Sequence, residues 1–289
     1  MKLIQFTLKD DLEQTLRIGG SVDGIAFCEL ESKGTMRDLI RRLDGSQAAL
    51  EGLEARIRGA EASYTREQIR LLSPLTDPDK IICIGLNYAD HVKESKMQTP
   101  KVPVLFPKYR NSLIGDGDAV VIPRDVQQCD YEAELAFIVG RTAKHVPIEE
   151  AMNYVFGYTI VNDVSARDIQ LNEPQWTRGK AIDTFAPTGP WIVTADEISD
   201  PHRLDISLKL NGEVMQSSNT KELIFNVPYL LSFLSKTITL QPGDIISTGT
   251  PFGVGMGRNP QVWLKDGDVT EIEIANIGLL STTYEAEKE

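Results

Sequence analysis

The chain has 289 residues, of which 41% are hydrophobic and 25% charged, so it can bury a full core as one large domain or as a large and a small one. Its 42 acidic and 30 basic side chains give a formal net charge of −12, which argues against nucleic acid and anionic membranes as partners. No stretch approaches the roughly 18 apolar residues that a membrane-spanning helix needs.

The cysteines indicate a reducing compartment. Cys28, Cys83 and Cys129 are odd in number, far apart in the chain and free of any C-x-x-C motif. The chain starts with an alternating, strand-like segment and not with the apolar core of a signal peptide. We therefore expect a cytoplasmic protein, or one of the mitochondrial matrix if a presequence has been removed.

The first 75 residues predict a small N-terminal α/β domain. Residues 2–30 read as a short β meander, with turn signals at two Gly-containing dipeptides. Apolar residues then recur at helical spacing in 36–43 and again in 50–57. A proline-punctuated connection at 73–79 follows, and we place the domain boundary there, which leaves 76–289 as the catalytic domain.

The larger domain is predicted to be rich in β-structure. Short apolar runs bounded by Gly and Pro predict strands at 81–84, 119–122, 133–139, 158–161, 191–194, 205–210, 244–247 and 270–274. Helices are predicted at 148–154, 165–170 and 227–234. This is not the regular βα alternation of a Rossmann fold, so the fold class that we predict is a β-rich α+β protein.

His91 is the histidine whose surroundings indicate chemistry. It follows an apolar strand, and Glu94 lies three residues further on, on the same side of a helix. A carboxylate can orient an imidazole and stabilise its protonated form, which makes a general base. The alternative is an exposed His and Glu that share a helix face.

Two glutamates predict a metal site. Glu132 and Glu134 lie in the apolar run 131–139, and successive side chains of a strand alternate between its faces, so both carboxylates point the same way. Two like charges in an apolar setting need a raised pKa, a basic side chain or a cation. The alternative is that both pair with Lys or Arg on a solvated strand face.

Asp163 ends another β-branched run and supplies a third carboxylate. Three oxygen ligands without a nearby Cys or His suit a hard cation, Mg²⁺ or otherwise Mn²⁺ or Ca²⁺.

Further along, Lys180 lies in a loop rich in Gly, Pro and aromatic residues. There it can meet a substrate carboxylate or an oxyanion; the alternative is a surface residue of a long turn. The glycine-rich segment 248–257 can offer backbone N–H groups, Gly249 among them, and the Thr250 hydroxyl to a small anion.

In chain order these pieces resemble the fumarylacetoacetate hydrolase superfamily, over about residues 80–280. The N-terminal domain and the ending NPQVWLKDGD (259–268) are most similar to the branch of fumarylacetoacetate hydrolase domain-containing proteins. The segments that carry the resemblance are ICIGLNYADHVKE (82–94), DYEAEL (130–135), GYTIVNDVSARD (157–168), GKAIDTFAPTGP (179–190), LNGE (210–213) and GDIISTGTP (243–251).

The resemblance implies a β-sandwich roll, a homodimer, Mg²⁺ on the three carboxylates and a lid that carries His91 and Glu94. It also implies a substrate site lined by Arg167, Gln170, Lys180 and Thr250, with Lys108 as a further candidate. The loop at 172–176 is shorter than in many relatives, which leaves the pocket size and the substrate open.

We therefore predict a Mg²⁺-dependent enzyme that binds a 2-oxo or 2,4-dioxo acid and stabilises its enolate. Hydrolytic C–C cleavage of an acylpyruvate, with His91 activating water and Lys180 holding the oxyanion, is the first choice. The alternative is decarboxylation or keto–enol tautomerisation of oxaloacetate. Rivals of other classes are a two-metal phosphohydrolase or nuclease and a noncatalytic metal-binding module.

Overall fold

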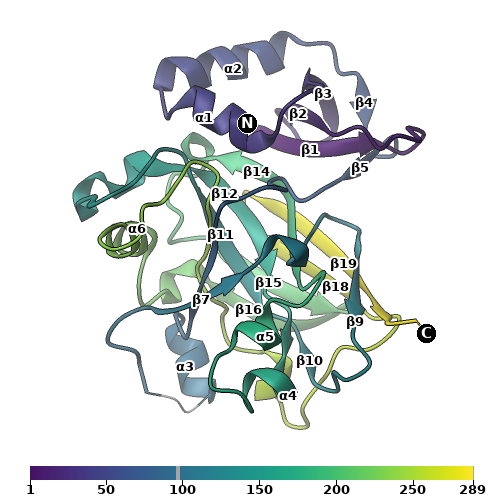
Figure 1. Ribbon diagram of the computed structural model, residues 1–289, viewed down its shortest axis with the longest axis vertical. Helices are drawn as coiled ribbons and strands as arrows, with labels where there is room; N and C mark the ends of the chain where they lie inside the picture. The colour runs from purple at the N-terminus through teal and green to yellow at the C-terminus, as the bar shows by residue number, and fades with distance from the viewer. Residues whose placement is uncertain (96–97, 289) are drawn as a thin grey trace.

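A large mixed sheet organises the computed structural model, which describes residues 1–95 and 98–288 (Figure 1). Its strands follow the order β4-β3-β2-β1-β14-β12-β11-β17-β6-β7, with β5 beside β1 and β8 beside β14. Their bounds are β1 Lys2–Leu8, β2 Arg17–Ser21, β3 Ala26–Glu31, β4 Tyr64–Thr65, β5 Ile69–Leu71, β6 Ile81–Gly85, β7 Val104–Lys108, β8 Leu113–Ile114, β11 Ala133–Val139, β12 Val155–Asn162, β14 Ala186–Thr194 and β17 Ile245–Ser247.

Two smaller sheets and short helices complete the fold. A five-stranded sheet has the order β16-β15-β18-β19-β9, and β10 pairs with β13. These strands are β9 Ala119–Ile122, β10 Cys129–Asp130, β13 Ser165–Ala166, β15 Asp205–Leu210, β16 Glu213–Asn219, β18 Val269–Ile274 and β19 Gly278–Ala286. The α-helices are α1 Met36–Leu43, α2 Gln47–Gly59, α3 Ala89–Ser95, α4 Arg167–Gln170, α5 Thr177–Lys180 and α6 Val227–Ser235.

Strand β11 is buried on both faces because a separate core packs against each of them. Leu135 and Phe137 join the core that includes the five-stranded sheet. Ala136 and Ile138, on the opposite face, join the core that includes the N-terminal helices and β6. Because side chains alternate along the strand, odd-numbered residues of β11 pack into one core and even-numbered residues face the other side. The even-numbered face is the one on which Glu134 lies.

The N-terminal segment is joined to the large sheet by backbone pairing. Strand β1 pairs antiparallel with β14, and α1 and α2 lie above β1–β3 in Figure 1. Thr35 begins α1 with a capping box to Asp38, and Ser46 caps α2, so local sequence sets both helix starts. The sheet is thus continuous across the predicted domain boundary near residue 75, and the division into two domains stays a prediction.

Most of the predicted elements are present, and the differences are local. Strands at 119–122, 133–139 and 205–210 have the predicted bounds. The segment 148–154 forms a 3₁₀-helix, and 165–170 divides into β13 and the single turn α4. The sequence analysis missed β7, β16 and β19, in which polar residues interrupt the apolar alternation. The β-rich α+β fold class is confirmed.

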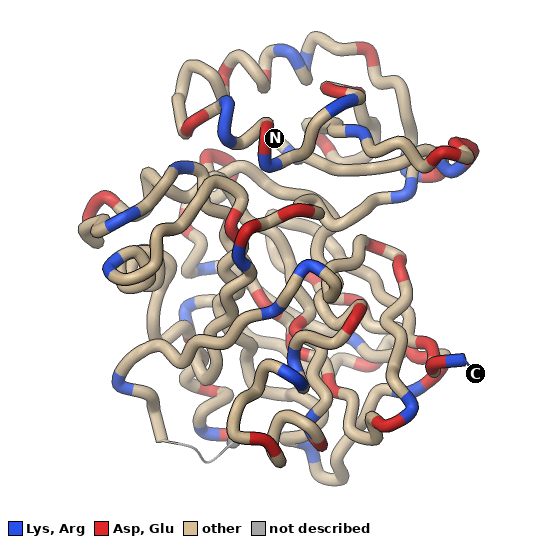
Figure 2. The backbone as a smooth tube through the Cα atoms, viewed as in Figure 1, with Lys and Arg blue, Asp and Glu red and all other residues tan. Residues whose placement is uncertain are grey.

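Charged residues are spread over the molecule. Lys and Arg alternate with Asp and Glu along the backbone of both the N-terminal segment and the larger body (Figure 2). None of the helices in the described ranges combines the length and apolarity that crossing a bilayer requires.

Candidate active site

Three buried carboxylates lie together where the central strand β11 begins and its neighbour β12 ends. The ligand atoms of Glu132, Glu134 and Asp163 lie within 4.8 Å of one another, and no other such group of acidic, Cys or His side chains occurs in residues 1–95 and 98–288. Glu134 lies in β11, and Glu132 comes just before it. The structure thus brings together the three residues that the sequence analysis assigned to a metal.

Strand register explains why Asp163 joins the two glutamates. Strands β11 and β12 pair so that Ala133 is opposite Asn162, and the Asp163 N–H donates to the Glu132 carbonyl at 2.9 Å. Asp163 is therefore the cross-strand neighbour of Glu132. The side chain of Asn162 contributes as well, because its Oδ1 accepts the Glu132 N–H at 3.1 Å.

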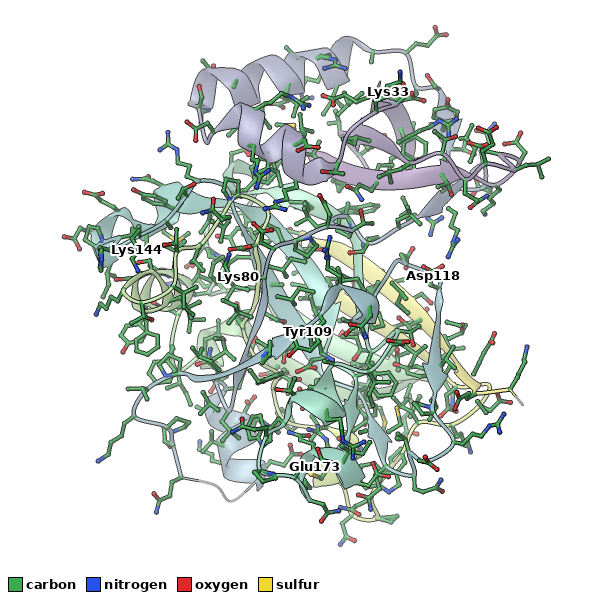
Figure 3. All side chains as sticks on the ribbon, viewed as in Figure 1. Lys33, Lys80, Tyr109, Asp118, Lys144 and Glu173 are labelled. Atoms are coloured by element: carbon green, nitrogen blue, oxygen red, sulfur yellow. The ribbon has the colours of Figure 1, made fainter. Side chains whose placement is uncertain are left out.

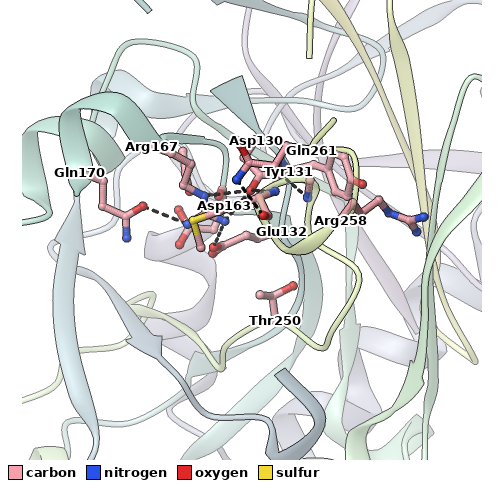
Figure 4. Close-up of polar contacts among 12 residues, drawn as sticks. Asp130, Tyr131, Glu132, Asp163, Arg167, Gln170, Thr250, Arg258 and Gln261 are labelled. Carbon is pink, nitrogen blue, oxygen red and sulfur yellow. Dashed lines mark hydrogen bonds and ion pairs between the residues drawn. The ribbon is translucent and has the colours of Figure 1, made fainter. Parts of the chain in front are cut away.

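Lys180 and Arg167 neutralise one side of the cluster. The Lys180 ammonium donates to Glu132 Oε2 and Asp163 Oδ2, both at 2.8 Å. Arg167 donates to Glu132 Oε1 at 2.6 Å, to Asp130 Oδ2 at 2.9 Å and to Gln170 Oε1 at 2.9 Å (Figure 4). All of these side chains are buried, so the contacts act in a medium of low polarity.

The two glutamates have opposite electrostatic environments. Burial by itself would raise the pKa of Glu132, but Lys180 and Arg167 outweigh it and hold this pKa well below its usual range. Burial, with Asp163 and Glu132 nearby, raises the pKa of Glu134 well above its usual value. The hydrogen bonds to Glu134 come from neutral donors, the Ser247 hydroxyl and the Gly249 N–H.

The basic groups keep their charge. Burial opposes the protonated form of Lys180, yet Asp163 and Glu132 raise its pKa. For Arg167, Glu132 and Asp130 likewise outweigh burial and raise the pKa. Around the cluster, four buried carboxyl groups meet three buried basic groups. These seven residues are Asp130, Glu132, Glu134, Asp163, Lys108, Arg167 and Lys180.

The donor set fits a hard divalent cation. Asp163 Oδ1 is buried and accepts no hydrogen bond, although Lys108 Nζ lies 2.8 Å away. The reason is that the Lys108 ammonium donates to the carbonyls of Val164, Lys180 and Phe185. Three clustered carboxylate oxygens, of which Asp163 Oδ1 accepts no hydrogen bond, are a donor set of the kind that Mg²⁺ or a similar ion prefers.

His91 and Glu94 form a pair on α3. His91 Nδ1 lies 3.1 Å from Glu94 Oε2, and Glu94 Oε1 accepts the Gly253 N–H at 2.9 Å. The imidazole is 7% exposed, so the alternative of a solvent-exposed pair does not hold. Asn87, just before α3, holds this segment by side-chain hydrogen bonds to the carbonyls of Phe225 and Thr248. The expected lid extends to residues 96 and 97, which lie outside the described residues.

A small cavity is lined both by glutamates of the carboxylate cluster and by His91. Its volume is about 130 Å³, and besides Glu132, Glu134 and His91 it is lined by Ile84, Gly85, Leu86, Phe106, Arg167, Gln170, Leu171, Trp176, Lys180, Thr250 and Met256. A water molecule takes up about 30 Å³ of liquid, and drug-sized pockets begin near 300 Å³, so this cavity suits a molecule of only a few carbons. Larger surface grooves exist elsewhere, but they contain none of the clustered carboxylates.

Two residues predicted to contact substrate lie behind the carboxylates instead of in the cavity lining. Lys108 fixes the backbone at Lys180 and Phe185, and the Gly249 N–H holds Glu134. Gly249 has φ of +99°, and a Cβ there would lie 2.9 Å from the Ile84 carbonyl oxygen, so a side chain would disturb the turn. Their predicted contact with substrate stays untested.

The sequence analysis missed two buried polar residues that support the site. Asp130 accepts the N–H groups of Gly255 and Met256 and the Arg167 guanidinium. Gln216, in β16, donates to Thr250 Oγ1 at 2.9 Å and accepts the Ala133 N–H at 2.9 Å. Asp130 is two residues from Glu132, and this proximity is a signal that could have found it. Gln216 has no comparable signal, because its partners are distant in the chain.

Comparison with known proteins agrees with this geometry. The family model described as fumarylacetoacetate (FAA) hydrolase C-terminal matches residues 80–284. The chain is 46% identical over 283 residues to oxaloacetate tautomerase FAHD2A, mitochondrial, of Homo sapiens, covering 97% of this chain and 90% of that protein. It is 42% identical over 287 residues to oxaloacetate tautomerase fahd2, mitochondrial, of Xenopus laevis, with 97% and 89% covered.

Solved structures show the same similarity. Fumarylacetoacetate hydrolase from Exiguobacterium antarcticum superposes with a TM-score of 0.81 at 36% identity, covering 99% of this chain and 100% of that one. Maleylpyruvate hydrolase from Sphingobium sp. SYK-6 superposes with a TM-score of 0.82 at 30% identity, with the same coverage.

Proposed function

Because the chain belongs to the fumarylacetoacetate hydrolase family of enzymes, we propose that it is a divalent-cation-dependent oxaloacetate keto–enol tautomerase. The relatives named as oxaloacetate tautomerases support the substrate and the reaction. They favour the alternative of the sequence analysis over its first choice, hydrolytic C–C cleavage. The observation that carries the proposal is the small cavity, which has His91 and two residues of the carboxylate cluster, Glu132 and Glu134, in its lining.

Glu132, Glu134 and Asp163 would hold the cation, with Mg²⁺ as the proposed ion. A bound divalent cation would polarise the 2-oxo group of the substrate and favour its enolate. The remaining chemistry falls to side chains of this chain.

Tautomerisation moves one proton between C3 and the 2-oxo oxygen of oxaloacetate, with no net change in composition. His91 is placed to take the C3 proton as the enol forms and to return it as the keto form is restored, since Glu94 engages Nδ1 and leaves Nε2 for the exchange. The 2-oxo oxygen gains or loses the balancing proton in exchange with water. Lys180, cationic and in the cavity lining, stabilises negative charge on the substrate oxygen. Arg167, Gln170 and Thr250 line the same cavity and would orient the carboxylates.

An assay of the purified protein with Mg²⁺ tests this assignment. We expect the enol and keto forms of oxaloacetate to equilibrate faster, followed by ultraviolet absorbance, with loss of the effect in chelator and return with added Mg²⁺. Parallel assays with acetylpyruvate and for pyruvate release from oxaloacetate test hydrolysis and decarboxylation. Efficient cleavage of acetylpyruvate without tautomerase activity would restore the hydrolase as the better function, which the solved hydrolase structures support.

A homodimer is proposed on the family resemblance. Light scattering over a concentration series tests it, and a mass that stays near 32.1 kDa at high concentration contradicts it. A location in the cytoplasm or the mitochondrial matrix also remains a proposal; the names of the two vertebrate relatives, which contain the word mitochondrial, support a location in mitochondria.

A further inference from the structure

One wall of the cavity is aromatic and consists of Trp176 packed on Phe106. Their ring centroids are 5.6 Å apart in an edge-to-face arrangement with an interplanar angle of 65°. Phe106 is buried and Trp176 is partly buried, and both line the cavity beside the carboxylate cluster. None of the steps of the proposed reaction uses either ring.

Gly85 leaves the space that the indole occupies. A Cβ at position 85 would lie 2.6 Å from Cζ3 and 3.2 Å from Cη2 of Trp176, so the ring lies directly on the glycine backbone. Distances below 3.0 Å are not tolerated without movement, and Phe106 prevents the indole from retreating freely. Gly85, Phe106 and Trp176 together form what we call the aromatic wall.

The aromatic wall is coupled to the catalytic side chains. The Trp176 carbonyl accepts the Gly179 and Lys180 N–H groups at 3.0 and 3.1 Å. Trp176 and Lys180 therefore belong to the same helical turn. The Lys180 ammonium also lies 4.9 Å from the Phe106 ring centroid. Trp176 ends the short loop between α4 and α5, in which Glu173 is labelled in Figure 3.

We propose that Trp176 determines substrate specificity by limiting the length of the 2-oxo acid that the cavity accepts. The polar lining binds the carboxylate and 2-oxo group that all such acids share. The indole occupies the space into which a bulky group beyond C3 would extend. The wall thereby selects small acids such as oxaloacetate over aromatic or long-chain 2-oxo acids. This inference rests on the proposed function for its substrate class.

Ligand binding tests the wall without depending on turnover. Calorimetric titrations in Mg²⁺ would compare oxalate, which lacks a side chain, with phenylpyruvate, which carries an aromatic ring on C3. We expect Trp176→Ala to bind phenylpyruvate at least about tenfold more tightly than the unaltered protein, since pocket contacts of this size change discrimination by about 10–200-fold. Oxalate affinity should stay within about twofold. Equal changes for both ligands, or none for phenylpyruvate, would overturn the proposal.

Two further variants keep the proposal testable if the Trp176→Ala protein does not fold. Trp176→Leu keeps an apolar side chain of intermediate size and should show a smaller gain of the same sign. Trp176→Phe, the matched control, should retain most of the preference for small acids. A Trp176→Leu protein that folds normally and keeps the unaltered ratio of affinities would also refute the wall.

A double-mutant cycle tests the contact itself. Gly85→Ala should weaken oxalate binding in the unaltered background, because its Cβ would overlap the indole and force the aromatic wall to move. In the Trp176→Ala background the same change should be nearly neutral. Additive effects would contradict the proposed contact. Turnover separates the two proposals: if the protein does not act on oxaloacetate but the affinity ratio shifts as expected, only the proposed function fails.

Discussion

The carboxylate cluster and helix α3 face the same cavity but are held in different ways. Glu132 and Asp163 follow from strand register and are fixed by several buried charged contacts. His91 lies on a seven-residue helix whose segment is attached by hydrogen bonds of Asn87, Asp90 and Glu94 to distant parts of the chain. A cation and its substrate need preorganised charge, whereas proton transfer needs one well-placed ring. The difference predicts that mutations in the carboxylate cluster and mutations in α3 have different effects, the first on cation binding and stability and the second on reaction rate.

The largest effect is expected for Asp163→Ala. It removes the carboxylate that faces Lys180 and Lys108, so two buried ammonium groups lose a partner. We expect loss of Mg²⁺ binding and of activity, and a fall of about 3–5 kcal/mol in the free energy of unfolding, measured by urea denaturation. Asp163→Asn keeps the shape and should restore much of the stability but not the binding. An unchanged Mg²⁺ titration in Asp163→Asn would show that this residue is not a ligand.

His91→Ala should affect rate alone. We expect activity to fall by about 10²–10⁴-fold, the usual contribution of a general acid–base group, while Mg²⁺ affinity and melting temperature hold. Glu94→Gln, which keeps a hydrogen-bond acceptor for the ring, should lose less. Full activity of His91→Ala on every accepted substrate would remove α3 from the mechanism. If oxaloacetate tautomerisation survives and acylpyruvate hydrolysis does not, His91 activates water.

Asp130→Asn should have an intermediate effect on activity. It tests whether a buried residue outside the cavity lining positions Arg167. Asp130 binds Arg167 and the N–H groups of Gly255 and Met256, so it positions the guanidinium and the loop that carries the Met256 side chain of the cavity. Residues that orient ligands in this way typically cost about 10–100-fold when changed. We expect that loss in kcat/KM for oxaloacetate. An unaltered kcat/KM would show that Arg167 needs no such partner.

Arg178→Ala should have the smallest effect on activity and stability. It removes an exposed ion pair and so provides a comparison with the buried ion pairs of the site. The Arg178 side chain is 68% exposed and pairs with Glu173 in the loop before α5. Exposed ion pairs contribute little because water screens them. We expect unchanged activity and melting temperature. A clear loss of activity would mean that the loop, and with it Trp176, depends on this pair.

The sequence by itself determined the features that depend on local periodicity. Alternation predicted the bounds of β9, β11 and β15 and placed Glu132 and Glu134 on one face, because strand side chains repeat every two residues. Helical spacing of apolar residues predicted α1. The family resemblance over 82–251 named the charged and polar residues that line the cavity but did not indicate its apolar and aromatic lining, because each motif lies within a short stretch of chain.

Only the tertiary structure decided which distant segments meet. Pairing of β11 with β12 and β17 made Asp163 a neighbour of Glu132 and brought Gly249 to Glu134. Folding also directed Lys108 to backbone carbonyls, joined Gln216 to Thr250, and placed Trp176 on Gly85. The physical reason is that strand pairing and side-chain packing depend on contacts between residues far apart in the chain, which no local period encodes. The volume of the cavity, on which the proposed preference for a small substrate rests, follows from those contacts.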